Sequence, residues 1–157
     1  MGMRPEPARP WGVIFDMDGV LIDSYQAHFE AWQKMIPVLG LEMTEEQFAP
    51  LFGRTNSAIL AVLIPSLPAE RYPIKDREKE TLFREILLVN FPEMDGAAEL
   101  IAALDQAGAA LAIGSSAPPE NVQVTLGKLS VGGKFKAATN GSEITRGKPD
   151  PEVFVKT

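Results

Sequence analysis

The stretch WGVIFDMDG, residues 11–19, decides the fold of this chain. Its first five residues form a short apolar run with β-branched and aromatic members, which predicts a buried strand. Two carboxylates, Asp16 and Asp18, follow the run directly, and Gly19 comes next. Because Asp and Gly also favour ordinary surface turns, this stretch alone leaves two interpretations. It is either a turn, or a pair of carboxylates placed at the end of a strand for chemistry.

The second half of the sequence alternates between helix and strand patterns. Helices are predicted over residues 96–107 and 119–129, and strands over residues 109–114 and 136–139. This alternation predicts an α/β protein with a parallel sheet and right-handed crossovers. Ligands of such sheets bind outside the carboxyl ends of the strands, and the polar residues predicted there are Asp16, Asp18, Ser115 and Ser116.

The residues between these two parts show only helix patterns. Apolar residues recur at three- and four-residue steps from Tyr25 to Leu39, with Gly40 where a helix would end. The spacing of Thr44 and Gln47 predicts a capping box that opens a short helix. Further helices are predicted over residues 57–64 and from about residue 75 to residue 89. An all-helical segment between two strands predicts an insert on an α/β core.

The predicted domain organisation follows from these patterns. The α/β core takes residues 11–24 and 93–157, the helical insert takes residues 25–92, and residues 1–10 are expected to be a disordered tail. Asp150 and Pro151 predict one more helix start, with Asp150 as the N-cap, and the chain stops within about two turns of it. A parallel sheet of three strands is a small one to stand alone. We therefore expect an incomplete core that belongs to a longer enzyme.

Composition excludes several classes of protein. With 157 residues, 45% of them hydrophobic and 23% charged, the chain suits one globular domain, or a small domain with an insert. The net charge of −6 argues against nucleic acid as a partner, and no apolar run is long enough to span a membrane. The absence of cysteine excludes disulfides and thiolate metal sites. A cytoplasmic protein is expected, and its oligomeric state is left unknown.

Four side chains could carry chemistry on a phosphate. Asp16 and Asp18 suit a nucleophile and a general acid/base, with Mg²⁺ offsetting the negative charge that they share with the substrate. The Ser115 hydroxyl can donate to a phosphate oxygen or cap the helix that follows it. Lys148 can neutralise a phosphate or a carboxylate, although a lone loop lysine is usually solvated.

Taken together, three motifs resemble the haloacid dehalogenase superfamily: FDMDGVLIDS at 15–24, IGSS at 113–116 and GKPDP at 147–151. The resemblance implies a Rossmann-like core with a C1-type helical cap, and a Mg²⁺-dependent phosphatase. It makes Asp16 the nucleophile that becomes an aspartyl-phosphate, and Asp18 the general acid/base whose backbone carbonyl also ligates Mg²⁺. Ser115 would bind the transferring phosphoryl group and Lys148 would steady the nucleophile. Dehalogenases lack the second aspartate, so Asp18 points to phosphoryl transfer.

The helical insert shows a second, narrower resemblance. AHFEAW at 27–32 and FGRTN at 52–56 are similar to the first cap helix and the specificity loop of β-phosphoglucomutase and related sugar phosphatases. The substrate-binding residues implied by the whole resemblance are Gly19, His28, Gly53, Arg54, Asn56, Lys79 and Ser116. Two of them have plainer interpretations. His28 lies in an apolar stripe and could be packed there, and the charged neighbours of Lys79 favour a solvated helix face.

The sequence therefore predicts a phosphatase that acts on a small phosphate ester, with a sugar phosphate as the expected substrate. The first alternative is a phosphomutase similar to β-phosphoglucomutase, although the mutase has an arginine where Asn56 aligns. The second alternative is an inactive fragment or phosphate-binding module, because the acidic fourth motif of the superfamily is missing from this chain.

Overall fold

The computed structural model describes residues 10–157, and the predicted disordered tail over residues 1–10 lies almost wholly outside this range. The chain divides into two compact units. The core unit comprises the described residues up to Leu21 together with Glu93–Thr157, and the helical unit comprises Ile22–Pro92.

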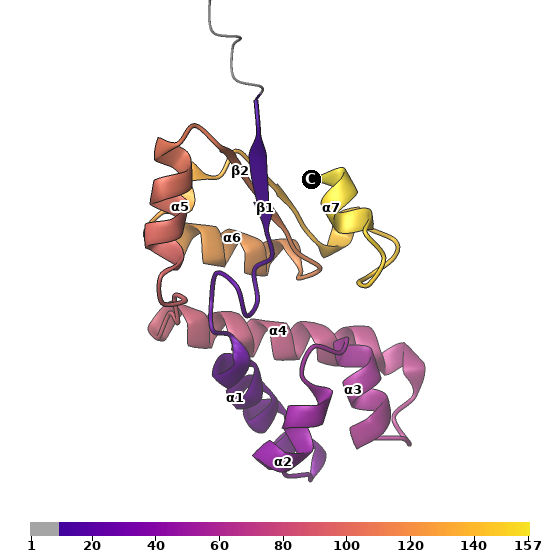
Figure 1. Cartoon of the computed structure of the whole chain (residues 1–157). Coiled ribbons are helices and arrows are strands. Elements are labelled where there is room, and N and C mark those ends of the chain that lie inside the picture. Colours follow the sequence, from indigo (N-terminus) through magenta and orange to yellow (C-terminus); the bar gives the residue numbers. More distant parts are fainter. Residues whose placement is uncertain (1–9) are drawn as a thin grey trace, which may run out of the picture. The chain divides into compact units, whose positions relative to one another are not determined.

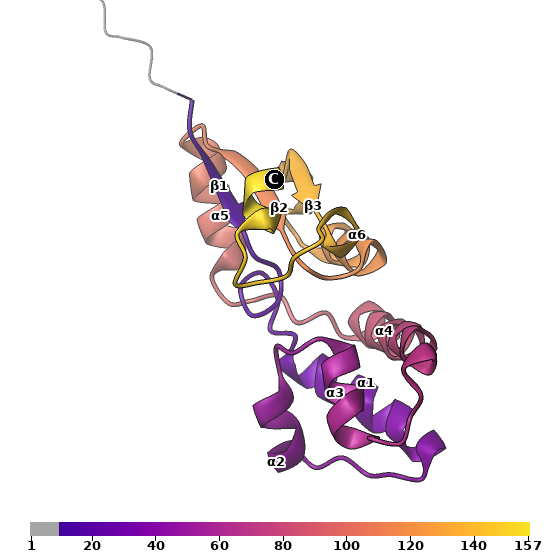
Figure 2. The same ribbon diagram turned by 90° about the vertical axis from the view of Figure 1, so that its right-hand side faces the viewer.

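The core unit is built on a parallel sheet. Strands β1 (Gly12–Phe15), β2 (Ala110–Gly114) and β3 (Ala137–Thr139) lie in the order β1-β2-β3. The strands can be followed in Figure 2. Phe15 pairs with Ile113, and Gly114 pairs with Thr139, so the strands end at one edge of the sheet. The predicted α/β class with a parallel sheet is confirmed.

Helices cover both faces of this sheet. Helices α5 (Ala97–Gln106) and α6 (Pro119–Lys128) lie on one face and α7 (Glu152–Lys156) lies on the other (Figure 1). The short 3₁₀ helices η4 (Gly132–Lys134) and η5 (Gly141–Glu143) flank β3. A Cβ atom on Gly114 would lie 3.1 Å from the Phe154 ring, so glycine lets α7 approach the strand closely.

The first strand was predicted to be buried, but the structure buries it only in part. Phe15 is buried, but the exposed fractions of Trp11 and Ile14 are 46% and 41%. In the described sheet β1 pairs with β2 alone, so one long side of the strand has no neighbouring strand to cover it.

Within the described residues of the helical unit, every helix or strand that the structure defines is a helix. The helices are α1 (Tyr25–Met35), η1 (Ile36–Leu39), α2 (Glu45–Phe48), η2 (Ala49–Leu51), α3 (Asn56–Leu63), η3 (Ala69–Arg71) and α4 (Tyr72–Val89). Side chains from α1, α2 and α3, among them Trp32, Phe48 and Leu60, are almost fully buried in one apolar cluster. No helix in residues 10–157 is long and apolar enough to cross a membrane.

Local signals explain where these helices begin and end. Thr44 Oγ1 accepts from Gln47 N (3.4 Å) and Gln47 Oε1 accepts from Thr44 N (2.9 Å), which confirms the capping box. The helix predicted from residue 25 to 39 changes to a 3₁₀ turn near Pro37, since proline has no N–H for an α-helical bond. Helix α4 begins at Tyr72, earlier than predicted, because Pro73 is well suited to a first turn.

Candidate active site

Asp16 lies directly beyond the carboxyl end of β1, and Ser115 lies directly beyond that of β2. Since Phe15 pairs with Ile113 in a parallel register, the residues that follow both strands reach the same edge of the sheet. Asp16 Oδ1 accepts from Met17 N (2.8 Å), and Met17 is fully buried. The turn after β1 is therefore anchored in the core while its carboxylates stay partly accessible.

Gly19 gives this turn its shape. Leu21 N donates to Met17 O (2.9 Å), which closes the chain back on itself. Gly19 has φ +74°, a left-handed conformation that other residues adopt at a cost, and no atom lies within 4 Å of where its Cβ would be. The requirement for glycine is thus conformational, and the turn leaves Asp18 half-buried beside the end of the strand.

Ser115 has an exposed fraction of only 1%, and its hydroxyl organises the loop after β2. Its Oγ accepts from Ala117 N (3.1 Å). The alternative interpretation of Ser115 as a helix cap is wrong, because Pro118 is the N-cap of α6 and Ser115 is too far ahead of the helix. Ser116, the next residue, is exposed. The loop after β3 packs against this one, and Gly141 N donates to Ala117 O (2.7 Å).

Lys148 reaches Asp16 from 132 positions later in the sequence. Its Nζ atom forms an ion pair with Asp16 Oδ2, and it lies 5.6 Å from the centre of the Phe154 ring. The exposed fractions of the two side chains in the pair are 36% for Lys148 and 29% for Asp16. The lysine is therefore a partner of the predicted nucleophile and not only a solvated loop residue.

One residue of this site escaped sequence reasoning. The Glu152 carboxylate accepts from Arg146 N (2.7 Å) and lies 2.6 Å from Lys156 Nζ. The hydrogen bond from Lys156, followed by the one from the Arg146 N–H, lowers the pKa of Glu152 to about 2. The only hint in the sequence is its place in the first turn of the last predicted helix. The assigned N-cap is Pro151, one residue later than predicted, but the Asp150 carboxylate still accepts from Glu152 N (3.0 Å), which is the hydrogen bond expected of a capping side chain.

In the helical unit the structure brings His28 and Lys79 together. The His28 ring stacks on Phe83, with centroids 3.9 Å apart and planes 6° from parallel. Lys79 Nζ lies 2.5 Å from His28 Nδ1 and 5.0 Å from the Phe83 centroid. Lys79 has an exposed fraction of 1%, so the prediction of a solvated helix face is wrong for this residue.

Asn56 joins the same polar cluster from the start of α3. Its Nδ2 atom donates to Asp76 Oδ1 (2.6 Å) and to Glu80 Oε1 (2.7 Å), and Glu80 Oε1 also accepts from Lys79 Nζ (2.9 Å). Sequence reasoning had singled out neither acidic residue. Gly53 and Arg54 are exposed in the loop that precedes α3.

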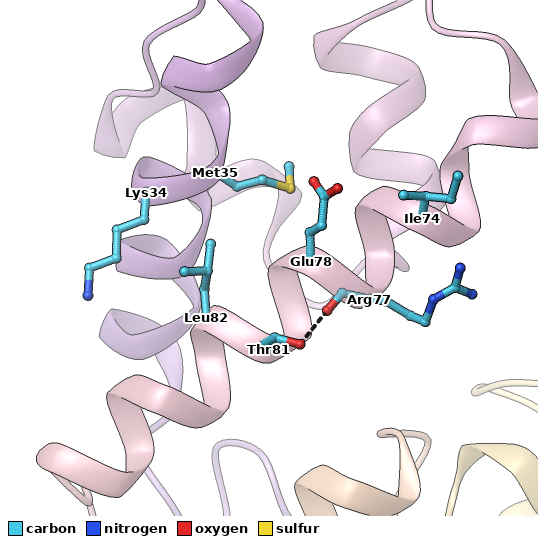
Figure 3. Close-up of a pocket in the computed structure, with 7 residues that line it drawn as sticks. All are labelled: Lys34, Met35, Ile74, Arg77, Glu78, Thr81 and Leu82. Carbon is cyan, nitrogen blue, oxygen red and sulfur yellow. Dashed lines mark hydrogen bonds between the residues drawn. The ribbon is translucent and has the colours of Figure 1, made fainter.

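A separate pocket of about 520 Å³ lies on the helical unit, between α1 and α4 (Figure 3). Its walls include Met35, Ile74 and Leu82, with the side chains of Lys34 and Arg77 at its margin. The hydroxyl of Thr81 donates to the Arg77 carbonyl (2.8 Å). None of the predicted site residues lines this pocket, so it does not carry the argument for the active site.

The chemistry of the donors near β1 fits Mg²⁺. Asp16 and Asp18 offer hard carboxylate and carbonyl oxygens, the ligands that this ion prefers, and Mg²⁺ readily keeps several waters. No cluster of three or more acidic or histidine side chains suited to a metal occurs among residues 10–157.

Comparison with known proteins identifies the family. The sequence model of the haloacid dehalogenase-like hydrolase family matches residues 13–157 of this chain. The chain belongs to this family. A phosphorylated carbohydrates phosphatase of Thermotoga maritima is 29% identical over 153 residues, which cover 91% of this chain and 67% of that protein. The β-phosphoglucomutase of Bacillus subtilis is 24% identical over 151 residues, which cover 91% of this chain and 66% of that protein.

Solved structures agree on the fold. A haloacid dehalogenase-type hydrolase of family IA from Entamoeba histolytica superposes with a TM-score of 0.82 at 29% identity, over 93% of this chain and 68% of that one. A β-phosphoglucomutase from Clostridium difficile superposes with a TM-score of 0.77 at 21% identity, over 93% of this chain and 68% of that one. The predicted superfamily and its fold are confirmed, and the chain spans about two thirds of the length of these relatives.

Proposed function

We propose that this chain carries the phosphoryl-transfer site of a phosphatase for small phosphate esters, with a sugar phosphate as substrate. The observation that carries the proposal is the ion pair between Lys148 and Asp16 at the carboxyl end of β1, where Asp18 and Ser115 also lie. In this proposal the core unit is the catalytic domain and the helical unit is its cap.

Each core residue has one role in the proposed reaction. An Asp16 oxygen attacks phosphorus while the bond between phosphorus and the leaving oxygen breaks, and Asp18 gives that oxygen a proton. Asp18 then takes a proton from the water that attacks the aspartyl-phosphate, which releases Asp16 and inorganic phosphate. The Ser115 hydroxyl accepts from Ala117 N and so keeps its own proton to donate to a phosphate oxygen. Lys148 holds Asp16 and offsets negative charge.

Charge balance supports a magnesium ion in this site. Two carboxylates and a phosphate ester meet there, while Lys148 supplies a single positive charge. When bound, Mg²⁺ would neutralise part of this charge and polarise the phosphoryl oxygens. The Asp16 carboxylate and the Asp18 backbone carbonyl are the protein groups proposed to hold it.

The remaining predicted residues are proposed to bind the substrate. Gly19 and Ser116 would contact it from the core unit, and His28, Gly53, Arg54, Asn56 and Lys79 from the helical unit. The contact between His28 and Lys79 supports this assignment, because it gathers two predicted residues from different helices. Among the relatives, a fructose-1-phosphate phosphatase of Escherichia coli is 25% identical over 148 residues. The activity that its name states fits the substrate class proposed here.

A phosphomutase is the second candidate, favoured by the similarity to β-phosphoglucomutase. One contact argues against it. The Asn56 amide already donates to two carboxylates, Asp76 and Glu80, so the group that aligns with the mutase arginine is surrounded by negative charge. Such a place disfavours a second phosphate, which the mutase reaction needs. A module that binds phosphate without turning over a substrate is the third candidate. The cytoplasmic location of the protein stays a prediction.

One experiment separates these candidates. Phosphate release by the 157-residue chain is measured with Mg²⁺ over a panel of sugar phosphates, beside Asp16→Asn and the exposed control Asp95→Asn. We expect release that only Asp16→Asn abolishes. A second assay supplies a hexose 1-phosphate and a bisphosphate primer. An isomerised product without release of inorganic phosphate would indicate a phosphomutase. If the chain binds phosphate but turns over no substrate, the third candidate, a phosphate-binding module, is supported. Phosphate release that survives Asp16→Asn would refute the proposed nucleophile.

A further inference from the structure

The loop that carries Lys148 is folded back onto the first turn of α7. Glu152 N donates to Asp150 Oδ1 (3.0 Å), and Asp150 N donates to Gly147 O (3.1 Å). Arg146 Nη1 lies 3.2 Å from Asp150 Oδ2. The loop is thereby closed on the side that leads into the helix, with Lys148 inside the closed segment.

Glu152 closes the other side of the loop. Its Oε2 atom accepts from Thr145 N (3.1 Å) and Arg146 N (2.7 Å), and its carboxylate also accepts from the Thr145 hydroxyl (3.0 Å). Lys156, one helical turn further on, pairs with Glu152 Oε1 (2.6 Å). The exposed fraction of the Glu152 side chain is only 11%. A single carboxylate thus collects donors from the start of the loop and from the body of the helix.

Helix α7 is itself fixed to the sheet. Val153 is fully buried, and the Phe154 ring packs beside Gly114 at the end of β2. The same ring lies 5.6 Å from Lys148 Nζ. A loop held to α7 is therefore held in place relative to the strand ends, where Asp16 lies.

We propose that Glu152 is a positioning residue that holds Lys148 against the Asp16 carboxylate. The inference rests on the proposed roles of Asp16 and Lys148, and it assigns Glu152 no contact with the substrate. Only an ionised carboxylate suits the place. A glutamine has one acceptor oxygen in place of two and would turn its own N–H groups toward the surrounding donors. The charge also attracts Lys156, which ties the loop to the helix.

The test compares Glu152→Gln with a matched control, Glu120→Gln. Both glutamates follow a proline in the first turn of a helix, but Glu120 is exposed and its substitution leaves the Lys148 loop untouched. Thr145→Val removes one hydroxyl contact of Glu152 and keeps the side-chain shape. The readout is the NMR signal of the Lys148 side chain in the folded protein, assigned by its loss in Lys148→Met.

We expect Glu152→Gln to move the Lys148 signal toward those of exposed lysines, Thr145→Val to move it less, and Glu120→Gln to leave it in place. A merely structural role would lower the unfolding midpoint of Glu152→Gln without moving the signal of the folded state. An unmoved Lys148 signal in folded Glu152→Gln and Thr145→Val would therefore overturn the proposal.

A second readout separates this inference from the proposed function. Inorganic phosphate is titrated into the whole chain, and Glu152→Gln is expected to weaken binding about tenfold through misplacement of Lys148. If Glu152 acts through Lys148, the double variant that combines Glu152→Gln with Lys148→Met binds phosphate no more weakly than Lys148→Met alone. Additive losses would overturn the positioning role. If the unaltered chain binds no phosphate, the proposed function fails, whereas the Lys148 signal still decides the role of Glu152.

Discussion

Gly141 offers a direct test of how the two loops at the strand ends meet. It begins η5, just after β3. A Cβ atom at this place would lie 2.4 Å from Ser116 O and 3.1 Å from Ala117 O. Real Cβ atoms essentially never approach other atoms within 3.0 Å, so Gly141→Ala must separate the loops by roughly the difference, about 0.6 Å.

The size of the effect follows from this overlap. Both atoms in the way belong to the backbone, and the separation also strains the hydrogen bond from Gly141 N to Ala117 O. Overpacking of a tight contact costs about 1–3 kcal/mol, so we expect the free energy of unfolding to fall by that amount. Ser115 precedes the displaced carbonyl. Since a shift of about 1 Å in a catalytic group can cost about 100-fold, we expect kcat/KM for a phosphate ester to fall by at least about tenfold.

Urea unfolding and phosphate release measure the two effects, with Gly133→Ala as the control. Gly133 lies in η4, where no atom is within 4 Å of an added Cβ. Alanine there is expected to be neutral, or to stabilise by about 0.4–1 kcal/mol through the unfolded state. If Gly141→Ala unfolds at the same urea concentration as Gly133→Ala, the loops are not in the tight contact described here. Unchanged kcat/KM in a destabilised Gly141→Ala would refute the link to Ser115.

Three further predictions concern other parts of the chain. Phe83→Leu keeps an apolar side chain but removes the ring beneath His28 and Lys79, so it should lower the free energy of unfolding by about 1–2 kcal/mol. Urea unfolding checks this, and an equal loss in a His28→Ala background would contradict the stacking. Thr44→Ala should lower the free energy of unfolding by about 1 kcal/mol, because the capping box is lost. Thr44→Ser should keep most of that stability in the same assay, because its hydroxyl can still cap the helix. Because the pKa of Glu152 is lowered from 4.5 to about 2, its contacts stabilise the fold above about pH 4.5 and weaken as the pH falls toward 2. The Tm of Glu152→Gln should thus lie below that of the unaltered chain at pH 6 and approach it near pH 2; a constant difference would contradict the assignment.

The sequence predicts most of the sheet and part of the site for a clear physical reason. Hydrophobic runs and turn residues mark β1 and β2 within a residue, and a parallel register brings the residues after them to one edge. Asp16 and Ser115 could therefore be assigned to the same place. Lys148 could be assigned only by resemblance, because its contact with Asp16 depends on how the loop before α7 folds back, and no local pattern in the sequence predicts that.

Burial of charge is where local patterns fail. The neighbours of Lys79 in the sequence are charged, and such a run is typical of a solvated face. Side chains from two other helices contribute to its burial. His28 of α1 contacts Lys79 directly, and Asn56 of α3 donates to Glu80, which in turn accepts from Lys79. Their approach is a property of the packed helical unit, so spacing along α4 alone could not reveal it.

The buried pair of Lys79 and Glu80 argues for binding more strongly than for stability. Removing two charges from water costs about as much as their attraction returns, and well-packed apolar residues often serve a fold equally well. Yet this pair lies beside His28, and its carboxylate also holds Asn56. Burying these polar groups together costs the fold free energy, and the proposed role of Lys79 in binding the substrate would account for their being kept.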